Sequence, residues 1–321
     1  MERKFIGLLA VASILMPLVG VVKAQQKDLR QLELNAFRGD AATAVGRARG
    51  FFANEGIDVK LTITPDSTSQ MRGLSNGANH IVLTSFDNVL AWSGKEGAEI
   101  FAVAQGRDDL DLSVFAAPNI RDWSGLKGKK LAVDAVDTAF ALVLRRILLA
   151  HGLDFNRGDY ELVPIGTTRL RFESLIRGET SGSMLNRPFD AQAKAAGMVR
   201  LGDSRGLLPY YPGSVYAANR TWAQRQRGDL VGFLRGWLTG VRWVKDPANR
   251  EEAVKVVAGE MKLDPKAAAE AINEQSASGA LNLSGLQSIL DLRVQFGFKL
   301  PMGDSLDRYY DLSYFREAAG K

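Results

Sequence analysis

Residues 122–153 read DWSGLKGKKLAVDAVDTAFALVLRRILLAHGL, and this stretch decides the fold because it joins a strand to a helix through a short polar loop. The segment 130–133 is predicted to be a short strand, and Thr138 can cap a helix whose apolar residues recur at helical spacing. Gly152 ends that helix, and residues 160–165 predict the next strand. A crossover helix of this kind makes the two strands parallel.

The same pattern occurs earlier in the chain. Residues 29–37 alternate apolar and polar side chains like a strand, and Asp40 can cap a helix that runs through Phe52. Gly56 follows as a helix-ending glycine, and residues 57–64 alternate again. Two such units in one chain predict two similar α/β lobes.

Glycines and lysines at 125–130, GLKGKK, suggest a phosphate-binding loop, but a loop of that kind follows a strand and opens a helix. Here the segment precedes the strand, so it is predicted to be a turn with solvated lysines. The loop between strand and helix is 134–138, and its counterpart in the first lobe is 38–40. Because ligands of open parallel sheets sit at the carboxyl ends of strands, both loops are expected to face a common cleft.

The rest of the chain extends the two lobes. Further strands are predicted at 80–83, 100–104, 112–116, 182–185 and 214–218, and helices at 230–244, 250–261, 265–275 and 284–296, the third capped by Asp264. The expected division is a first lobe at 25–117, a second lobe at 118–212, and a return to the first lobe at 213–321.

The first 24 residues resemble a leader for export. A basic start precedes an apolar run at 5–22, and Val22-Lys23-Ala24 places small residues where a signal peptidase cuts. We therefore expect cleavage near Ala24-Gln25 and a protein of the periplasm; a membrane anchor is the alternative. Loss of the leader removes three basic residues and one acidic residue, which lowers the net charge from +5 to +3. So small an excess does not indicate nucleic-acid binding.

The chain contains no cysteine, which excludes disulfides, thiolate metal sites, cysteine nucleophiles and a lipid-modified cysteine. Its two histidines, His80 and His151, stand apart and are interpreted as structural. We therefore expect no metal, no cofactor and no serine–histidine–carboxylate catalysis.

Several short segments, in order along the chain, carry a resemblance to a known family. They are 48–59 (ARGFFANEGIDV), 74–77 with 81–88, 125–133 (GLKGKKLAV), 175–178 (LIRG), 184–190 (MLNRPFD) and 243–253 (WVKDPANREEA). With them the chain resembles periplasmic solute-binding proteins of ABC transporters, in the group that binds alkanesulfonates, nitrate and thiamine precursors. It departs from that group where Ala78-Asn79-His80 follows Gly77 in place of an acidic residue, so the resemblance does not give the ligand.

The resemblance implies a type II two-lobe α/β fold, with mixed, mostly parallel sheets joined by hinge strands. It also implies a monomer that closes on one small molecule and delivers it to a permease and an ATPase. The ligand residues it implies, with Tyr211 added from the expected aromatic wall, are Phe37, Arg38, Asp40, Asp66, Ser67, Ser85, Phe86, Asp87, Asn88, Asp137, Thr138, Thr168, Arg169, Asn186, Arg187, Phe189 and Tyr211.

Each of these residues also has a structural interpretation. Ser85, Asp87 and Thr138 can be helix caps alone. The arginines can grip a carboxylate or sulfonate with two parallel bonds, or they can be solvated. The aromatic residues can line the cleft or fill the core.

Two classes of function remain open from sequence. A binding module fits a chain without cysteine and nearly without histidine. The alternative is a pyrimidine-synthase-like enzyme on the same fold, although such enzymes carry a cysteine-rich motif and work in the cytoplasm. A sensor subunit for a membrane receptor is a further alternative. The ligand itself stays undecided among sulfonates, aromatic or aliphatic carboxylates and pyrimidines.

Overall fold

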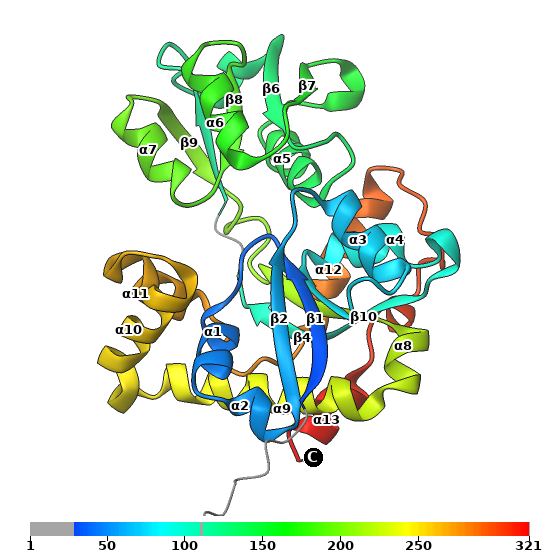
Figure 1. The fold of residues 1–321 in the computed structure, drawn as a ribbon. Helices are drawn as coiled ribbons and strands as arrows, with labels where there is room; N and C mark the ends of the chain where they lie inside the picture. The colour runs from blue at the N-terminus through cyan, green and yellow to red at the C-terminus, as the bar shows by residue number, and fades with distance from the viewer. Residues whose placement is uncertain (1–28, 110–111, 321) are drawn as a thin grey trace, which may run out of the picture.

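The computed structural model describes residues 29–109 and 112–320, which form two α/β lobes, each built on a five-stranded sheet (Figure 1). The first sheet has the order β2 (Ile57–Ile63), β1 (Arg30–Ala36), β3 (Ile81–Thr84), β10 (Ser214–Asn219), β4 (Ile100–Arg107). The second has the order β7 (Tyr160–Pro164), β6 (Lys129–Val133), β8 (Gly182–Leu185), β5 (Ser113–Ala116), β9 (Val199–Asp203). The predicted two-lobe α/β fold is confirmed.

Helices cover both sheets. Those of the first lobe are α1 (Ala41–Ala48), α2 (Phe51–Asn54), α3 (Ser67–Ser75), α4 (Phe86–Trp92), α8 (Arg220–Arg225), α9 (Arg227–Lys245), α10 (Arg250–Met261), α11 (Pro265–Glu274), α12 (Leu283–Gln295) and α13 (Leu312–Ala318). Those of the second lobe are α5 (Ala139–Ala150), α6 (Thr168–Ile176) and α7 (Phe189–Ala195). Short 3₁₀ turns lie at Lys95–Gly97, Trp123–Leu126, Phe155–Arg157, Pro247–Asn249 and Leu306–Tyr309.

The two sheets share one plan. In each, the fourth strand, β10 or β5, is antiparallel to both neighbours, and the first three strands are parallel. The register of β1 with β2 runs from Arg30 opposite Ile57 to Ala36 opposite Ile63. The parallel pairs β1–β2 and β6–β7 are those predicted from the repeated unit.

Three details differ from the sequence-based expectation. The helix expected from Asp40 to Phe52 is divided into α1 and α2 at Gly50, whose φ of 71° ends α1. β5 pairs in the second sheet, so the chain has already changed lobes before residue 113, whereas the expected division kept 112–116 in the first lobe. β9 was not expected, because its short, half-exposed sequence VRLGD carries little apolar pattern.

The segment GLKGKK forms the predicted turn. Asp122 caps a 3₁₀ turn at Trp123–Leu126, and Gly128 at φ 71° leads into β6. The lysines on either side of Gly128 are exposed, and one of them, Lys127, pairs with Asp159 at 3.6 Å. The segment therefore leads into a strand and does not open a helix, as predicted.

The lobes share a buried core on one side. α12 of the first lobe packs against both α4 and α5, and its Leu286 and Ile289 lie in one apolar cluster with Leu144 and Ile147 of α5. The guanidinium of Arg145 on α5 also lies 4.2 Å from the ring centre of Phe296, at the end of α12. The contact between the lobes is thus a packed interface and not only a pair of connecting chains.

α9 crosses α1 at a close approach that only glycine permits. A β-carbon on Gly240 would lie 2.4 Å from the backbone oxygen of Ala42, far inside van der Waals contact. Gly240→Ala is expected to lower the free energy of unfolding by about 1–3 kcal/mol, measured by urea denaturation.

Gly228 is the matched control, because it lies on the same helix and a β-carbon there meets nothing within 4 Å. Gly228→Ala is expected to be neutral or to stabilise the protein by up to about 1 kcal/mol. Equal effects of the two substitutions would contradict the close approach at Gly240.

The predicted leader at 1–24 lies outside the described residues. Within residues 29–109 and 112–320, we find no helix with the length and apolar character needed to cross a membrane.

Candidate functional site

The direction of the strands brings the loops of both sheets to a common edge. β4 leads into the second lobe, and β3, β1 and β2 run parallel to it, so the loops after these strands point toward the second lobe (Figure 1). β5 enters and β9 leaves the second lobe at the opposite side of the same junction. Because β8 is antiparallel to β5, and β6 and β7 are parallel to β8, their carboxyl ends also lie there. We call the facing loops the interlobe edge: residues 37–40, 64–66 and 85 of the first lobe, and 134–138, 165–168 and 186–188 of the second.

Asp40 uses both carboxylate oxygens inside the first lobe. Oδ1 accepts the backbone N–H of Thr43 at 2.7 Å and caps α1. Oδ2 accepts the hydroxyl of Tyr216 at 2.7 Å and the indole N–H of Trp237 at 3.2 Å. Burial and the charge of Asp40 raise the pKa of Tyr216, so the tyrosine stays a donor. The predicted cap is confirmed, and the carboxylate is directed inward.

Asp87 is held by an arginine that sequence reasoning did not find. Nη1 of Arg293 on α12 donates to Oδ2 of Asp87 at 2.7 Å, and both side chains are almost fully buried, at 6% and 1% exposed. The same nitrogen lies 3.4 Å from the backbone oxygen of Asp137, in a loop of the second lobe. Arg293 therefore connects α4, α12 and the interlobe edge. A single arginine within a helix, so distant in sequence, gives no local signal.

Burial is the main cause of the pKa shifts of Asp87 and Tyr211, which lie near Arg293. It raises the pKa of the Asp87 carboxyl to about 6, and the charge and hydrogen bond of Arg293 act in the opposite direction. Oδ1 of Asp87 and Nε of Arg293 are buried without a hydrogen-bond partner among the described residues. Burial also raises the pKa of the Tyr211 phenol, with the charge of Asp87 as the next cause. Asp87 and Tyr211 are therefore interior groups at the junction of the lobes.

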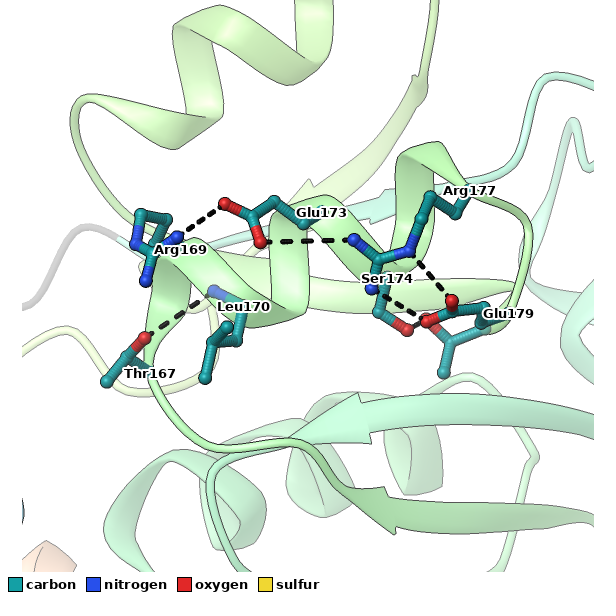
Figure 2. Close-up of polar contacts among 8 residues, drawn as sticks. Thr167, Arg169, Leu170, Glu173, Ser174, Arg177 and Glu179 are labelled. Atoms are coloured by element: carbon teal, nitrogen blue, oxygen red, sulfur yellow. Dashed lines mark hydrogen bonds and ion pairs between the residues drawn. The ribbon is translucent and has the colours of Figure 1, made fainter.

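The three predicted arginines have three different environments. Nη2 of Arg38 donates to Oε2 of Glu274 at 2.5 Å. Arg187, in the second lobe, lies 3.3 Å from Glu270, so this ion pair joins the two lobes. Arg169 donates to Glu173 one turn further along α6 at 2.7 Å, and Figure 2 shows that this pair continues to Arg177 on the helix surface. Arg169 is 61% exposed and fits the solvated interpretation.

Glu270 and Glu274 lie one turn apart on α11. Glu270 pairs with Arg187, and Glu274 pairs with Arg38. Arg107, the last residue of β4, lies 3.6 Å from Glu274 and was not predicted. Burial and the neighbouring charge of Arg38 lower the pKa of Arg107 to about 10. One face of α11 is thus where arginines of both lobes meet.

A buried arginine supports the loops of the second lobe. Arg171 donates to the backbone oxygen of Gly166 at 2.7 Å and to the hydroxyl of Thr168 at 3.1 Å. Burial lowers the pKa of Arg171, and burial raises the pKa of the nearby Asp134 carboxyl. Asp134 accepts a 2.5 Å hydrogen bond from Thr138, which also caps α5 as predicted. This network fixes the loops at 134–138 and 165–168.

The other predicted residues divide between the surface and the core. Phe86 is fully buried, so it is a core residue and not part of an exposed aromatic wall. Phe37 is 48% exposed at the interlobe edge, and Phe189 packs on Phe172 with ring centres 5.7 Å apart. Asp66, an exposed cap of α3, and exposed Asp137 lie at the edge, where Ser85 and Asn186 are half-buried. Ser67 and Asn88 are half-buried in the first turns of α3 and α4.

Apolar side chains are exposed at the same edge. Phe37 and Val136 lie in its loops, and Ile63 and Leu170 lie one and two residues outside them. Ala36 at the end of β1 pairs with Ile63 at the end of β2, so Phe37 comes directly after the residue that lies opposite Ile63. The edge therefore combines exposed apolar groups with arginine, a mixture that suits a small amphiphilic anion.

Both histidines and two surface hollows lie apart from this edge. His80 stacks on Trp222 with ring centres 5.2 Å apart, and His151 stacks on Trp123 at 4.1 Å. Among the described residues, no group of three or more His, Cys, Asp or Glu side chains could hold a metal ion. Two surface hollows lie elsewhere: one of about 610 Å³ between Pro247 and Pro265, and one of about 410 Å³ beside His80.

The sequence of this chain matches a known family and a known protein. A family model described as NMT1/THI5 like matches residues 41–250. YtlA of Bacillus subtilis (strain 168), whose name marks it provisionally as a binding protein, is 23% identical over 224 residues; the match covers 66% of this chain and 65% of that protein.

Solved structures share the fold at low sequence identity. The aliphatic sulphonate-binding protein SsuA of Escherichia coli aligns with a TM-score of 0.69 and 18% identity, over 89% of this chain and 99% of that one. The nitrate-binding protein NrtA of Synechocystis PCC 6803 aligns with a TM-score of 0.72 and 12% identity, over 91% and 89%. Both likenesses concern the fold.

Proposed function

This chain belongs to the NMT1/THI5-like family, and on that premise we propose that it is an extracytoplasmic solute-binding protein. It captures a small organic anion, a sulfonate or a carboxylate, between its lobes and delivers it to the permease and ATPase of an ABC importer. The observation that carries the proposal is the meeting of the loops of both sheets at one edge, with arginines and exposed apolar groups. The names of SsuA and NrtA support an anion as ligand.

The mechanism is binding with closure and no bond is broken. A ligand that touches both lobes favours the arrangement in which the interlobe edge is closed, because it binds that arrangement best. The core shared by α5 and α12 is the side on which the lobes pivot, and Arg187 with Glu270 joins them near the other end of the edge. Residues of both lobes therefore contribute to one site.

Export and a monomeric state belong to the same proposal. The leader predicted at 1–24 would carry the chain to the periplasm, where the permease would receive the loaded protein. A pyrimidine-like ligand and a sensing role are the neighbouring alternatives. An enzyme of the pyrimidine-synthase kind is less well supported, because the chain has no cysteine.

Thermal unfolding in the presence of candidate ligands tests the proposal. The purified protein would be screened with butanesulfonate, benzenesulfonate, taurine, benzoate, hexanoate, nitrate and a pyrimidine. A ligand at about 100 times its Kd stabilises the folded state by about 2.7 kcal/mol, which raises Tm by roughly 2–4 °C. A shift for one class of anion supports the proposal.

Two other results would contradict it in different ways. A shift for the pyrimidine alone would move recognition from the arginines to the apolar groups. Chemical conversion of the compound that produces the shift, followed by chromatography, would replace the binding protein with an enzyme.

A further inference from the structure

Two arginines of the first lobe share one carboxylate at the interlobe edge. Arg38 follows β1 and Arg107 ends β4, and both approach the same atom, Oε2 of Glu274, at 2.5 and 3.6 Å. Among the described residues, the guanidinium of Arg107 donates no hydrogen bond. All three side chains stay partly accessible, at 40%, 24% and 26% exposed.

Within the described residues, the two guanidiniums have few hydrogen-bond acceptors. Each guanidinium offers five N–H donors, and one carboxylate cannot saturate two of them. Asp40 and Asp109 act on Arg107 only through their charges, and both oxygens of Asp40 already accept hydrogen bonds within the lobe. The charges of Glu274, Asp40 and Asp109 all oppose the repulsion between Arg38 and Arg107, but among the described residues only Glu274 forms an ion pair with Arg107.

The position of Glu274 is fixed by its neighbour. Oε1 of Gln275 accepts the backbone N–H of Ala42 at 3.1 Å, and Nε2 donates to the backbone oxygen of Gly106 at 3.0 Å. The backbone of Gln275 also pairs with that of Arg107 in an isolated bridge. The backbone at Glu274 is thus held beside the end of β4, from where the side chain of Glu274 reaches both arginines.

We propose that Arg38 and Arg107 form the anion subsite and that Glu274 is an internal counter-ion, which the carboxylate or sulfonate of the ligand displaces. The inference rests on the proposed function and specifies its ligand as a singly charged organic anion. The exchange needs no proton transfer, because one anion replaces another beside the same cations. Phe37, next to Arg38 and exposed, gives the apolar part of such a ligand a surface to contact.

Calorimetric titration with butanesulfonate, benzenesulfonate, benzoate and hexanoate tests the inference. Glu274→Gln is expected to bind the anion about tenfold more tightly, since the competing carboxylate is gone. Arg38→Gln and Arg107→Gln are each expected to weaken binding about tenfold or more, because each removes half of the subsite.

Glu55→Gln is the matched control. Glu55 pairs with Arg235 at 2.9 Å, with exposures of 24% and 45% that are close to those of Glu274 and Arg38, but on the surface where α2 meets α9. Glu55→Gln removes one carboxylate from a comparable ion pair, and it is expected to leave the affinity for the anion unchanged. Thermal unfolding of each variant without ligand shows whether it is folded.

The outcomes separate this inference from the proposed function. If an anion binds and Glu274→Gln behaves like Glu55→Gln, the inference is wrong and the binding protein stands. Weaker binding in Glu274→Gln would make Glu274 a ligand contact, for example to an ammonium group, and would equally overturn displacement. If none of the four anions binds to the wild type or to Glu274→Gln, this anion subsite and the proposed anion ligand both fail.

Discussion

Arg293→Met is expected to lower the free energy of unfolding by about 3–5 kcal/mol, because it leaves the carboxylate of Asp87 buried without its cation. The pair is only 6% and 1% exposed, so water cannot replace the lost partner. The substitution also removes the contact from Arg293 to the backbone oxygen of Asp137 in the other lobe. Urea denaturation followed by circular dichroism measures the loss.

The double variant Asp87→Asn/Arg293→Met is the control. It removes both charges, so it is expected to be more stable than Arg293→Met alone, since a neutral pair carries less desolvation cost than one unpaired charge. If the single and double variants lose the same free energy, the Asp87–Arg293 ion pair is not what Arg293 contributes.

The pH dependence of the same proteins is a second readout. Burial raises the pKa of Asp87 to about 6 in the folded protein, above its ordinary value of 3.8 in the unfolded chain. The folded state therefore holds this proton over a pH range in which the unfolded chain releases it. The free energy of unfolding of the wild type is expected to fall as the pH rises from about 4 through about 6, relative to that of Asp87→Asn.

Asp40→Ala is expected to cost about 3–5 kcal/mol. Loss of the cap of α1 contributes about 1 kcal/mol, and the buried donors of Tyr216 and Trp237, which both bond to Oδ2, lose their acceptor at about 1–3 kcal/mol each. Part of the cost is recovered because the Tyr216 hydroxyl keeps its 2.7 Å contact with Thr43. The change in the urea midpoint measures the effect.

Asp66→Ala provides the comparison, because Asp66 caps α3 in the same way but from an exposed position. Its Oδ1 accepts the backbone N–H of Ser69 at 2.7 Å, and no buried donor depends on it. A loss of about 1 kcal/mol is expected there. A similar loss for Asp40→Ala would mean that the hydrogen bonds of Tyr216 and Trp237 add nothing to stability.

The fold was predictable because its signals are local. A strand, a capping side chain, an apolar helix face and a glycine recur in order at 29–64 and again at 130–165, and each is set by neighbours within a few residues. The caps predicted at Asp40, Thr138 and Asp264 are present, and of the two candidates for α4 it is Ser85 and not Asp87 that caps the helix. The elements that the sequence did not predict lack a clear apolar pattern. Examples are β9 and α6, whose polar and apolar residues do not fall on separate faces.

The candidate site was predictable only as a set of loops. Local sequence places Asp40 and Asp87 at helix N-termini, but it does not show the distant partners that turn both carboxylates inward, Trp237 for one and Arg293 for the other. Arg107 and Glu274 escaped for the same reason, since they meet only through the packing of α11 against the end of β4. Long-range pairing, and not residue type, decides which charged side chains stay accessible at the interlobe edge.

The double passage of the chain between the sheets has an evolutionary consequence. Ser113, where the second sheet begins, pairs with Asp203, where it ends, and Arg107 pairs with Ser214 in the first sheet. The second lobe is thus a cassette whose two ends are neighbours, inserted into an otherwise continuous first lobe. Recombination at these adjacent junctions could exchange one wall of the site between relatives while the other wall is inherited unchanged, provided that the α5 surface still fits α12.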